Sequence, residues 1–340
     1  MCFMEEGDCP GLGGGFYGVH MRLAVVIVNY RTPQLCVECL ASIAAERAGI
    51  PHLQVLLLDN ASPDDSVAVI AGAVALRGWQ DWVRILPQKQ NLGFAAGNNV
   101  GIRKALESDN PPEFLLLLNS DTRVHAGCLR KSMERMGRDR HIGALSCMVR
   151  NADGSVQNVC RKFATPLRES CRAVGLPYLL PRLFGWANLE DTGWDRRSTA
   201  REVEWIGGAF MLLRAAVIQG LGGLDESFFF YGEDIELCHR IRRAGWSVFF
   251  DPAGEITHLG GGSSDGSRLA DLRRLEFVWK ARFHVQRKCY GVLSALWIRT
   301  LYLGSVALNL ASIAARGGRG SQAWVRTAKN LRVLAGTLKQ

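Results

Sequence analysis

The stretch Phe114–Asp121 reads FLLLLNSD, five apolar residues followed by three polar ones. A short continuous apolar run of this kind predicts a strand that is buried on both faces. Three similar runs precede it along the chain: Leu23–Val28, Val55–Leu58 and Val83–Leu86. Helical patterns lie between them, at about 33–46 and 96–106. Strands that alternate with helices predict an α/β fold with a parallel sheet and right-handed crossovers.

Polar residues follow three of these strands directly. Asn29 and Tyr30 follow the first, Asp59 ends the second, and Asn119 and Asp121 close the stretch quoted above. Because ligands of parallel sheets bind beyond the carboxyl ends of the strands, we expect these side chains to converge on one polar site. A carboxylate there suits a hard divalent cation. The alternative is a turn or a helix cap, which Asn, Ser and Asp also favour.

Two further candidates lie in the second half of the chain. Glu233 and Asp234 follow the aromatic run 228–231 at the start of a predicted helix. A carboxylate between apolar walls can act as a general base, whereas the alternative is an acidic pair favoured by the helix dipole. His258 follows a predicted strand at 248–250. A lone histidine is more often structural, but beside a carboxylate site its imidazole can bind a metal.

The segment Asn91–Gly101 reads NLGFAAGNNVG and leads into a helix. Its backbone N–H groups at that helix N-terminus can face a diphosphate, and the alternative is a tight turn built from cap residues. Residues 150–205 show no regular pattern, and 203–213 read as a strand broken by Gly207 and Gly208. Helical patterns fill 268–315 and 321–338.

Six motifs stand along the chain in the order VIVNY, LLDNAS, NLGFAAGNN, LLNSD, WIGGAF and FFYGEDIEL. This order resembles the family 2 inverting glycosyltransferases, most of all their rhamnosyltransferase-like branch, over about 23–262. The resemblance implies a GT-A fold, which is a mixed, mainly parallel sheet flanked by helices, here with a C-terminal helical extension. It also implies a nucleotide-diphospho-sugar donor and a divalent metal, Mg²⁺ or Mn²⁺.

The resemblance also implies a role for each matched residue. Donor contacts fall to eight residues, Asn29, Tyr30, Asp59, Asn91, Gly93, Asn98, Asn119 and Asp121. The metal falls to Asp121 and His258, and acceptor contacts fall to Trp205, Gly207 and Gly208. Asp234 matches the catalytic base, with Glu233 in support. Asn119 replaces the first Asp of the DxD motif. Asn98 stands where many relatives carry Arg, so that phosphate contact is either lost or supplied by another basic residue.

The implied reaction is a single displacement with inversion. Asp234 takes the proton of an acceptor hydroxyl, and a metal on Asp121 offsets the charge of the leaving nucleoside diphosphate. The sugar is rhamnose in the branch that the chain resembles. The acceptor is a saccharide or a lipid-linked saccharide in cell-surface polysaccharide synthesis. The alternative is a catalytically degenerate GT-A nucleotide-binding scaffold protein, which Asn119 favours.

The charge of the chain is uneven. Its 340 residues include 41 Lys and Arg and 32 Asp and Glu, for a net charge of +9. Eleven basic residues and no acidic one follow Glu276, so residues 1–276 carry −2. Together with the glycine-rich start, this pattern predicts a disordered extension at 1–20, a GT-A catalytic domain at 21–265 and a basic helical extension at 266–340.

The most apolar part of that extension is Leu293–Ala315, which contains Arg299. Its uncharged part, 300–315, is shorter than the roughly 20 residues that span a bilayer. We expect it to pack on the catalytic domain or to lie in the interface of an anionic membrane. The alternative is a basic helical subdomain with solvated charges.

Ten cysteines with no secretory signal before them indicate free thiols. We therefore expect a cytoplasmic protein, peripheral on the inner face of the plasma membrane. Nucleic acid is not an expected partner, because no module of stacking aromatic residues accompanies the basic charge.

Overall fold

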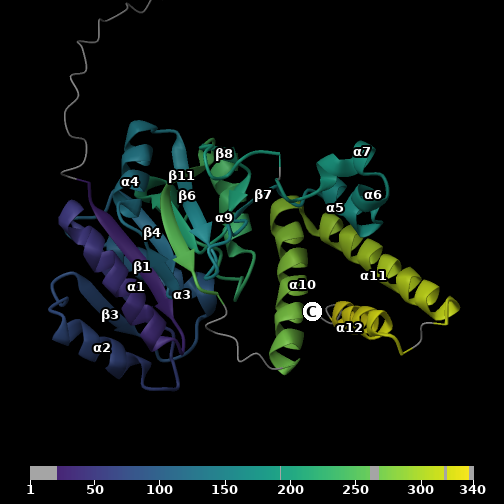
Figure 1. Cartoon of the computed structure of the whole chain (residues 1–340), viewed down its shortest axis with the longest axis horizontal. Coiled ribbons are helices and arrows are strands. Elements are labelled where there is room, and N and C mark those ends of the chain that lie inside the picture. Colours follow the sequence, from purple (N-terminus) through teal and green to yellow (C-terminus); the bar gives the residue numbers. More distant parts are fainter. Residues whose placement is uncertain (1–20, 192, 261–267, 318–319, 337–340) are drawn as a thin grey trace, which may run out of the picture.

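The computed structural model describes residues 21–191, 193–260, 268–317 and 320–336. The predicted extension at 1–20 and the predicted boundary between 265 and 266 lie outside these residues. A large twisted sheet with its covering helices lies at one end of the molecule, and three C-terminal helices lie at the other (Figure 1).

In the described residues nine strands form one mixed sheet, in the order β3-β2-β1-β4-β10-β6-β11-β5, with β8 beside β11. Their bounds are β1 Leu23–Asn29, β2 Leu53–Asp59, β3 Val83–Pro87, β4 Phe114–Asn119, β5 Thr122–Val124, β6 Ile142–Arg150, β8 Arg201–Val203, β10 Phe210–Arg214 and β11 Ser247–His258. The first four strands are parallel, and β10 runs antiparallel between β4 and β6. The predicted mixed, mainly parallel sheet is confirmed.

The strand order reverses at β1, with β2 on one side and β4 on the other. Right-handed crossovers therefore place α1 (Pro33–Glu46) and α2 (Ser66–Leu76) on one face and α3 (Gly93–Leu106) on the other. α1 packs against α2 and α4 (Cys128–Arg138), while α3 packs on β1 and β2. In such a sheet the ligand crevice forms beyond the carboxyl ends of the strands at the reversal, which here are β1 and β4.

The core of the sheet consists of the apolar runs that predict the strands. Val25, Leu57 and Leu116 are fully buried in β1, β2 and β4. All four predicted strands are present, and each extends one or two residues beyond its predicted bounds at one or both ends. Two further helices complete this part, α8 (Ala215–Gly220) and α9 (Glu233–Arg243).

The prediction of irregular structure at 150–205 is wrong in part. This segment contains β7 (Cys160–Arg161), three short helices and the strand β8. The helices are α5 Pro166–Ala173, α6 Leu176–Leu179 and α7 Pro181–Phe184, followed by a 3₁₀ turn, Gly185–Ala187. β7 pairs with β9 (Trp205–Ile206) in a separate two-stranded sheet.

The strand predicted at 248–250 is also longer than expected and runs to His258 as β11. Pro252 and Gly254 make its middle read as a loop. They lie where the register of β11 against β6 shifts, between Asp251 and Glu255. A bulge tolerates both residue types within a strand. Beyond this bulge β11 continues to His258.

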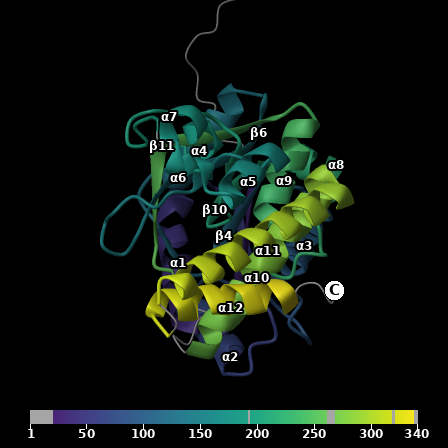
Figure 2. The same cartoon turned by 90° about the vertical axis from the view of Figure 1, so that its right-hand side faces the viewer.

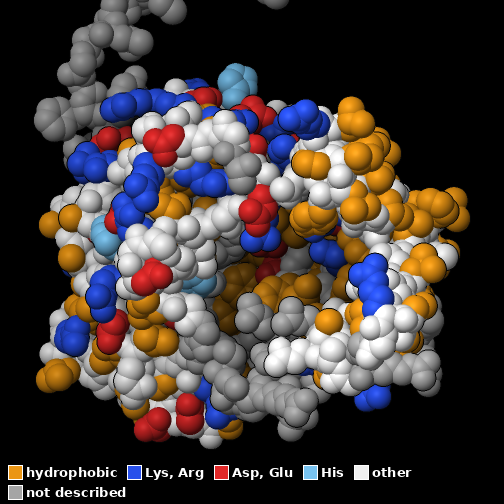
Figure 3. All heavy atoms as spheres, turned by 45° about the vertical axis from the view of Figure 1, so that its right-hand side comes forward, with side chains coloured by type: hydrophobic (Ala, Val, Ile, Leu, Met, Phe, Trp, Pro, Cys, Tyr) orange, Lys and Arg blue, Asp and Glu red, His pale blue; other side chains and the backbone are white. Residues whose placement is uncertain are grey.

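Three helices form the C-terminal part, α10 (Arg268–Tyr290), α11 (Val292–Ala315) and α12 (Gln322–Gly336). They pack on one another (Figure 2) around a small core of their own, formed by Phe283, Ile298 and Leu334. The helical structure predicted at 268–315 is confirmed, and that predicted at 321–338 is confirmed as far as Gly336, since 337 and 338 lie outside the described residues. Among the described residues, α11 alone is long and apolar enough to cross a membrane by length and composition, with a mean hydropathy of 1.3. The face shown in Figure 3 is hollowed near its centre, between the sheet-bearing part and these helices.

Candidate active site

The ends of β1 and β2 hold a buried amide–carboxylate pair. Asn29 and Asp59 are partners in the strand register, and Asn29 Nδ2 donates to Asp59 Oδ1 at 2.8 Å. Ser62 adds two more donors, its backbone N–H to Asp59 Oδ2 at 3.0 Å and its hydroxyl to Oδ1 at 2.7 Å. The carboxylate is therefore held in one orientation at the end of the sheet, next to the half-buried Tyr30.

The segment that begins α3 is built by two side-chain amides. Asn60 Nδ2 donates to Asn91 Oδ1 and to the Gly93 carbonyl, both at 3.0 Å, and Asn60 Oδ1 accepts the Leu92 N–H at 2.9 Å. Asn91 Oδ1 also accepts the Gly93 N–H at 2.9 Å. Asn60 belongs to the LLDNAS motif but not to the predicted site residues. The turn predicted as the alternative for this segment is present.

Gly93 occupies the left-handed region, with φ +78°. A Cβ there would lie 2.5 Å from the Phe229 carbonyl oxygen, which accepts the Phe94 N–H at 2.7 Å. The donor-side segment therefore touches the aromatic run that precedes α9. Asn98 lies further along α3, is buried, and donates from Nδ2 to the Phe94 carbonyl at 2.9 Å.

Asn119, Asp121 and His258 meet where β4 and β11 end. His258 Nε2 lies 3.2 Å from Asp121 Oδ1 and 3.3 Å from Asn119 Nδ2. On the other side of the ring, His258 Nδ1 lies 3.0 Å from Gln157 Oε1. Because that oxygen only accepts, Nδ1 donates to it, and Nε2 is the ring nitrogen that faces the Asp121 carboxylate.

A lone pair and a carboxylate oxygen at 3.2 Å repel one another unless a proton or a cation lies between them. The donor set, one carboxylate and one imidazole nitrogen, therefore fits a divalent cation. The described residues contain no group of three or more His, Cys, Asp and Glu side chains that could hold a metal by themselves. Phosphate oxygens and water would have to complete the coordination. Gln157, which orients the imidazole, has no motif that could reveal it in the sequence.

Glu233 and Asp234 form the first turn of α9, after Gly232 with φ +94°. Asp234 Oδ1 accepts the Ile235 N–H at 2.8 Å, and Oδ2 accepts the Gly208 N–H at 3.3 Å. Burial raises the pKa of Asp234, while these two N–H groups and the Arg161 cation act to lower it. Burial and the Asp234 charge raise the pKa of Glu233 well above its ordinary value.

These different environments make the two carboxyl groups differ in how readily each loses its proton. Glu233 Oε2 is buried and has no hydrogen-bond partner among the described residues. Asp234 has two backbone donors that favour its charged form. Asp234 is therefore the member of the pair that ionises first, and Glu233 is the one that retains a proton. Neighbouring carboxyls with different environments are the pattern by which sites divide acid and base roles.

The segment that contains Trp205, Gly207 and Gly208 runs between the candidate metal site and Asp234. Gly208 bonds Asp234 and packs against Phe94. The carbonyl of Ala209, the next residue, accepts the Asn119 N–H at 3.2 Å, because β10 begins just after it and runs antiparallel to β4. The acceptor segment predicted from the sequence thus lies between the candidate metal pair and the candidate base.

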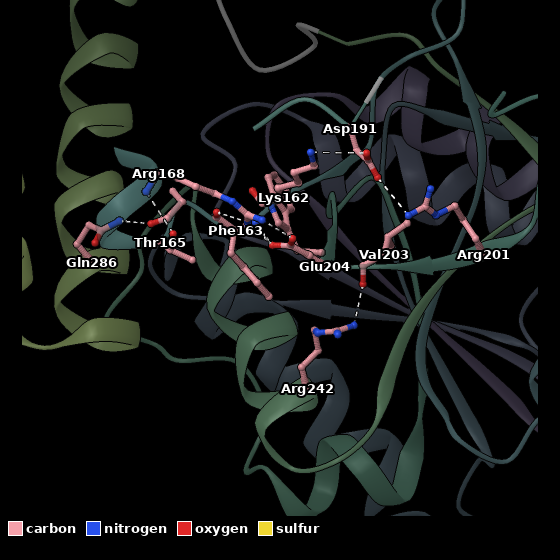
Figure 4. Close-up of polar contacts among 12 residues, drawn as sticks. Lys162, Phe163, Thr165, Arg168, Asp191, Arg201, Val203, Glu204, Arg242 and Gln286 are labelled. Carbon is pink, nitrogen blue, oxygen red and sulfur yellow. Dashed lines mark hydrogen bonds and ion pairs between the residues drawn. The ribbon is translucent and has the colours of Figure 1, made fainter. Parts of the chain in front are cut away.

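Trp205 and Arg161 are partners across the two-stranded sheet. Several cations nearby are ion-paired, as Figure 4 shows: Arg168 with Glu204, and Lys162 and Arg201 with Asp191. Arg161 is exposed and makes no ion pair or side-chain hydrogen bond with any described residue. Within the described part of the chain it is therefore a cation without a partner, and it acts on Asp234. Arg161 lies outside the six sequence motifs.

The candidate cation pair and the candidate base both lie beyond the strand ends of a sheet whose order reverses at β1, where α/β folds of the nucleotide-binding class hold their ligands. The family described as glycosyltransferase like family 2 matches residues 20–280, and the chain belongs to this family. It is a glycosyltransferase.

Relatives and solved structures agree with this assignment. The chain is 28% identical, over 77% of its length and 85% of the relative's, to the N-acetylglucosaminyl-diphospho-decaprenol L-rhamnosyltransferase of Mycobacterium tuberculosis. It is 27% identical, over 66% of its length and 63% of the relative's, to the low-salt glycan biosynthesis hexosyltransferase Agl10 of Haloferax volcanii.

Among solved structures, the mannosyltransferase PcManGT from Pyrobaculum calidifontis, in complex with GDP-Man and Mn²⁺, superposes with a TM-score of 0.57. The match has 15% identity and covers 96% of this chain and 90% of that one. This likeness confirms the GT-A fold. Relatives that are named as transferases favour an enzyme over the degenerate scaffold.

Proposed function

We propose that the chain transfers a sugar, with inversion, from a nucleotide-diphospho-sugar to a hydroxyl of a saccharide or lipid-linked saccharide, in cell-surface polysaccharide synthesis. One observation carries this proposal: Asp234 accepts the Gly208 N–H, and the residue after Gly208 accepts the N–H of Asn119, whose side chain lies beside His258. A base on one side and a cation site on the other suit direct displacement at a single carbon. The rhamnosyltransferase name of the mycobacterial relative supports rhamnose as the sugar and a lipid-diphosphate-linked acceptor.

In this mechanism the hydroxyl oxygen of the acceptor forms a bond to the anomeric carbon of the donor while the bond from that carbon to the diphosphate breaks. Asp234 accepts the proton that the hydroxyl loses. The Gly208 and Ile235 N–H groups hold the carboxylate in position and favour its charged form before the proton arrives. Glu233, protonated and buried behind it, adds no competing charge. Phe94 closes one side of this region by packing on Gly208.

The donor would lie along the ends of β1, β2 and α3. Asn29, Tyr30 and Asp59 would border the base and ribose, in the crevice where the strand order reverses. Asn91, Gly93 and Asn98 would line its path, with the backbone at the start of α3 toward the diphosphate. The side-chain amides of Asn91 and Asn98 already hold backbone groups, so their contribution is to shape this path.

Asp121 and His258 would hold the divalent cation, Mg²⁺ or Mn²⁺, with Asn119 beside them. A bound cation would offset the charge of the leaving nucleoside diphosphate. Gln157 would keep the imidazole turned with Nε2 toward the cation.

We further propose that residues 21–265 form the catalytic domain and 266–340 a helical extension, because the helices of the extension have their own small core. The cysteines of the described part are free thiols. Free thiols and a nucleotide-sugar donor favour the cytoplasmic face of the plasma membrane as the place of action.

The substitution Asp234→Asn tests the proposal, because it keeps the size of the side chain and removes the base. We expect turnover to fall about 10²- to 10⁴-fold, while the dissociation constant of the donor, measured by calorimetry, stays close to that of the wild type. The exposed Asp65 provides the matched control, as Asp65→Asn. Near-normal turnover of Asp234→Asn would overturn the base assignment.

A further inference from the structure

One end of the molecule exposes large apolar side chains from two segments that lie far apart in the sequence. Tyr178, Leu179 and Leu183 come from α6 and α7 and are 73%, 72% and 68% exposed. Leu293, Trp297 and Leu308 come from α11 and are 83%, 56% and 73% exposed. We call these six residues the apolar face. Figure 3 shows orange side chains gathered on this side of the molecule. Large exposed apolar patches mark contact sites.

The two segments are joined to each other through α5. Trp297 Nε1 donates to Ser170 Oγ at 2.9 Å, and the Tyr302 hydroxyl donates to the buried Glu169 carboxylate at 2.5 Å. Glu169 also pairs with Arg172 at 2.9 Å. α11 therefore lies against α5 as well as against α10 and α12 (Figures 1 and 2), and its exposed side chains, among them Leu293 and Leu308, lie on its remaining face.

The two segments that form the apolar face carry basic residues and no acidic ones. The sequence between Glu169 and Glu190 contains no acidic residue, and none follows Glu276. Arg182 is exposed in the first of these segments, whereas Arg172 pairs with Glu169 and Arg299 lies over the ring of the buried Phe283. A surface of apolar and aromatic residues on segments whose only charged residues are basic matches the interface of an anionic bilayer.

We propose that the apolar face docks on a bilayer that contains anionic lipids, with α11 lying in the interface rather than crossing it. A crossing α11 would have to give up the Trp297–Ser170 and Tyr302–Glu169 bonds and leave Glu169 without its hydroxyl partner. A second copy of the chain would bring the same basic residues against one another. Tyr178 and Trp297 have the amphipathic rings that prefer the headgroup level of a membrane.

The docked face is connected to the acceptor side of the active site. α5 follows β7 after four residues, and Arg168 on α5 makes two bonds, at 2.7 and 3.0 Å, to Glu204, which precedes Trp205 (Figure 4). The acceptor segment and the docked helices are therefore one bonded unit. This inference rests on the proposed function to the extent that a lipid-linked acceptor gives the docking its purpose.

The test uses the full chain with vesicles of phosphatidylcholine alone and with about 30% phosphatidylglycerol. We expect flotation with the anionic vesicles, weaker flotation with the neutral ones, and at least a tenfold loss of binding for the double variant Leu179→Gln, Leu183→Gln. Leu76, which is 87% exposed on α2, gives the matched control as Leu76→Gln, and its binding should equal that of the wild type. Melting temperatures and turnover on a soluble acceptor check that the variants fold.

Three results would overturn the docking. The first is that the double variant binds the anionic vesicles as well as the wild type does. The second is that alkaline carbonate fails to extract the bound protein, as for a helix that spans the bilayer, and the third is that light scattering shows a dimer of the wild type that the double variant does not form. Turnover on a soluble acceptor is measured without vesicles. A failure of the proposed transfer activity is therefore distinguishable from a failure of docking.

Discussion

Gly93, on the donor side, packs against Phe229 in the loop that precedes α9, so Gly93→Ala separates packing from chemistry. The substitution has two physical effects. An alanine at φ +78° costs roughly 1–2 kcal/mol because its side chain disfavours the left-handed region. Its Cβ would also lie 2.5 Å from the Phe229 carbonyl oxygen, a backbone atom that cannot rotate away. Overpacking of this kind typically costs about 1–3 kcal/mol more.

The expected loss of stability is therefore about 2–5 kcal/mol, read from the midpoint of urea unfolding. Since Phe229 precedes Glu233 and Asp234 by only a few residues, we also expect turnover to fall about 10- to 100-fold through displacement of the base. Gly78→Ala is the matched control. Gly78 also has a positive φ, +67°, but a Cβ there meets nothing within 4 Å. It should lose only the backbone contribution and keep full turnover. Equal effects of the two variants on stability and turnover would refute the reasoning.

Three further variants test the cation pair and the base. Gln157→Leu removes the acceptor that orients His258 and is expected to weaken Mn²⁺ binding about 10- to 100-fold in a metal titration with nucleoside diphosphate present; unchanged affinity would remove Gln157 from the site. Arg161→Gln removes a cation that lowers the pKa of Asp234, so the acidic limb of the kcat/KM profile should move to higher pH, and an unmoved limb would contradict this. Burial and Asp234 raise the pKa of Glu233 to about 8, above roughly 4.3 in the unfolded chain. The stability contributed by the protonated form is thus present below about pH 4 and is lost as pH rises toward 8. The Glu233→Gln variant has no carboxyl group to ionise, so its melting temperature relative to that of the wild type should rise as pH increases through this window. A difference in melting temperature that does not change with pH would count against a buried protonated Glu233.

The sheet is predictable because its strands are buried on both faces. Runs such as Leu115–Leu118 and Val25–Val28 contain little but apolar residues, and burial in a parallel sheet demands that composition. The polar residues at the strand ends are predictable for the same reason, since the position of each follows from where the apolar run stops. Asn29, Asp59 and Asn119 lie where this reasoning puts them.

The short helices α6 and α7 escape the same reasoning. Hydrophobic periodicity predicts a helix through the apolar side that faces the core. In this segment Tyr178, Leu179 and Leu183 face outward, and each helix has a single turn. Pro177 and Pro181 stand within the first two positions of their helices, a local signal that a periodicity search does not weigh. Hydrophobic periodicity therefore does not reveal these helices, because their large apolar side chains face solvent instead of the core.

Gln157 and Arg161 are unpredictable for a different reason. Both lie outside every motif, and each reaches the site only through tertiary pairing, Gln157 with His258 and Arg161 with Trp205. A sequence pattern reports a residue's neighbours in the chain, while these two act on neighbours in space. Residues of this kind require the register of the strands before any role can be assigned to them.

The loop before α9 explains why donor binding and base placement belong to one structural unit. Asn99 on α3 holds this loop through Leu224, whose N–H donates to Asn99 Oδ1 at 2.8 Å and whose carbonyl accepts from Asn99 Nδ2 at 2.9 Å. A second contact follows at Phe229, whose carbonyl accepts the Phe94 N–H. The helix that begins at the donor segment therefore fixes the loop at two points just before Asp234. Because close-packed interiors transmit strain, we expect a substitution in the donor segment to displace the base as well, so that turnover and donor affinity change together there. At Asp234 itself they separate, since its side chain bonds only backbone N–H groups.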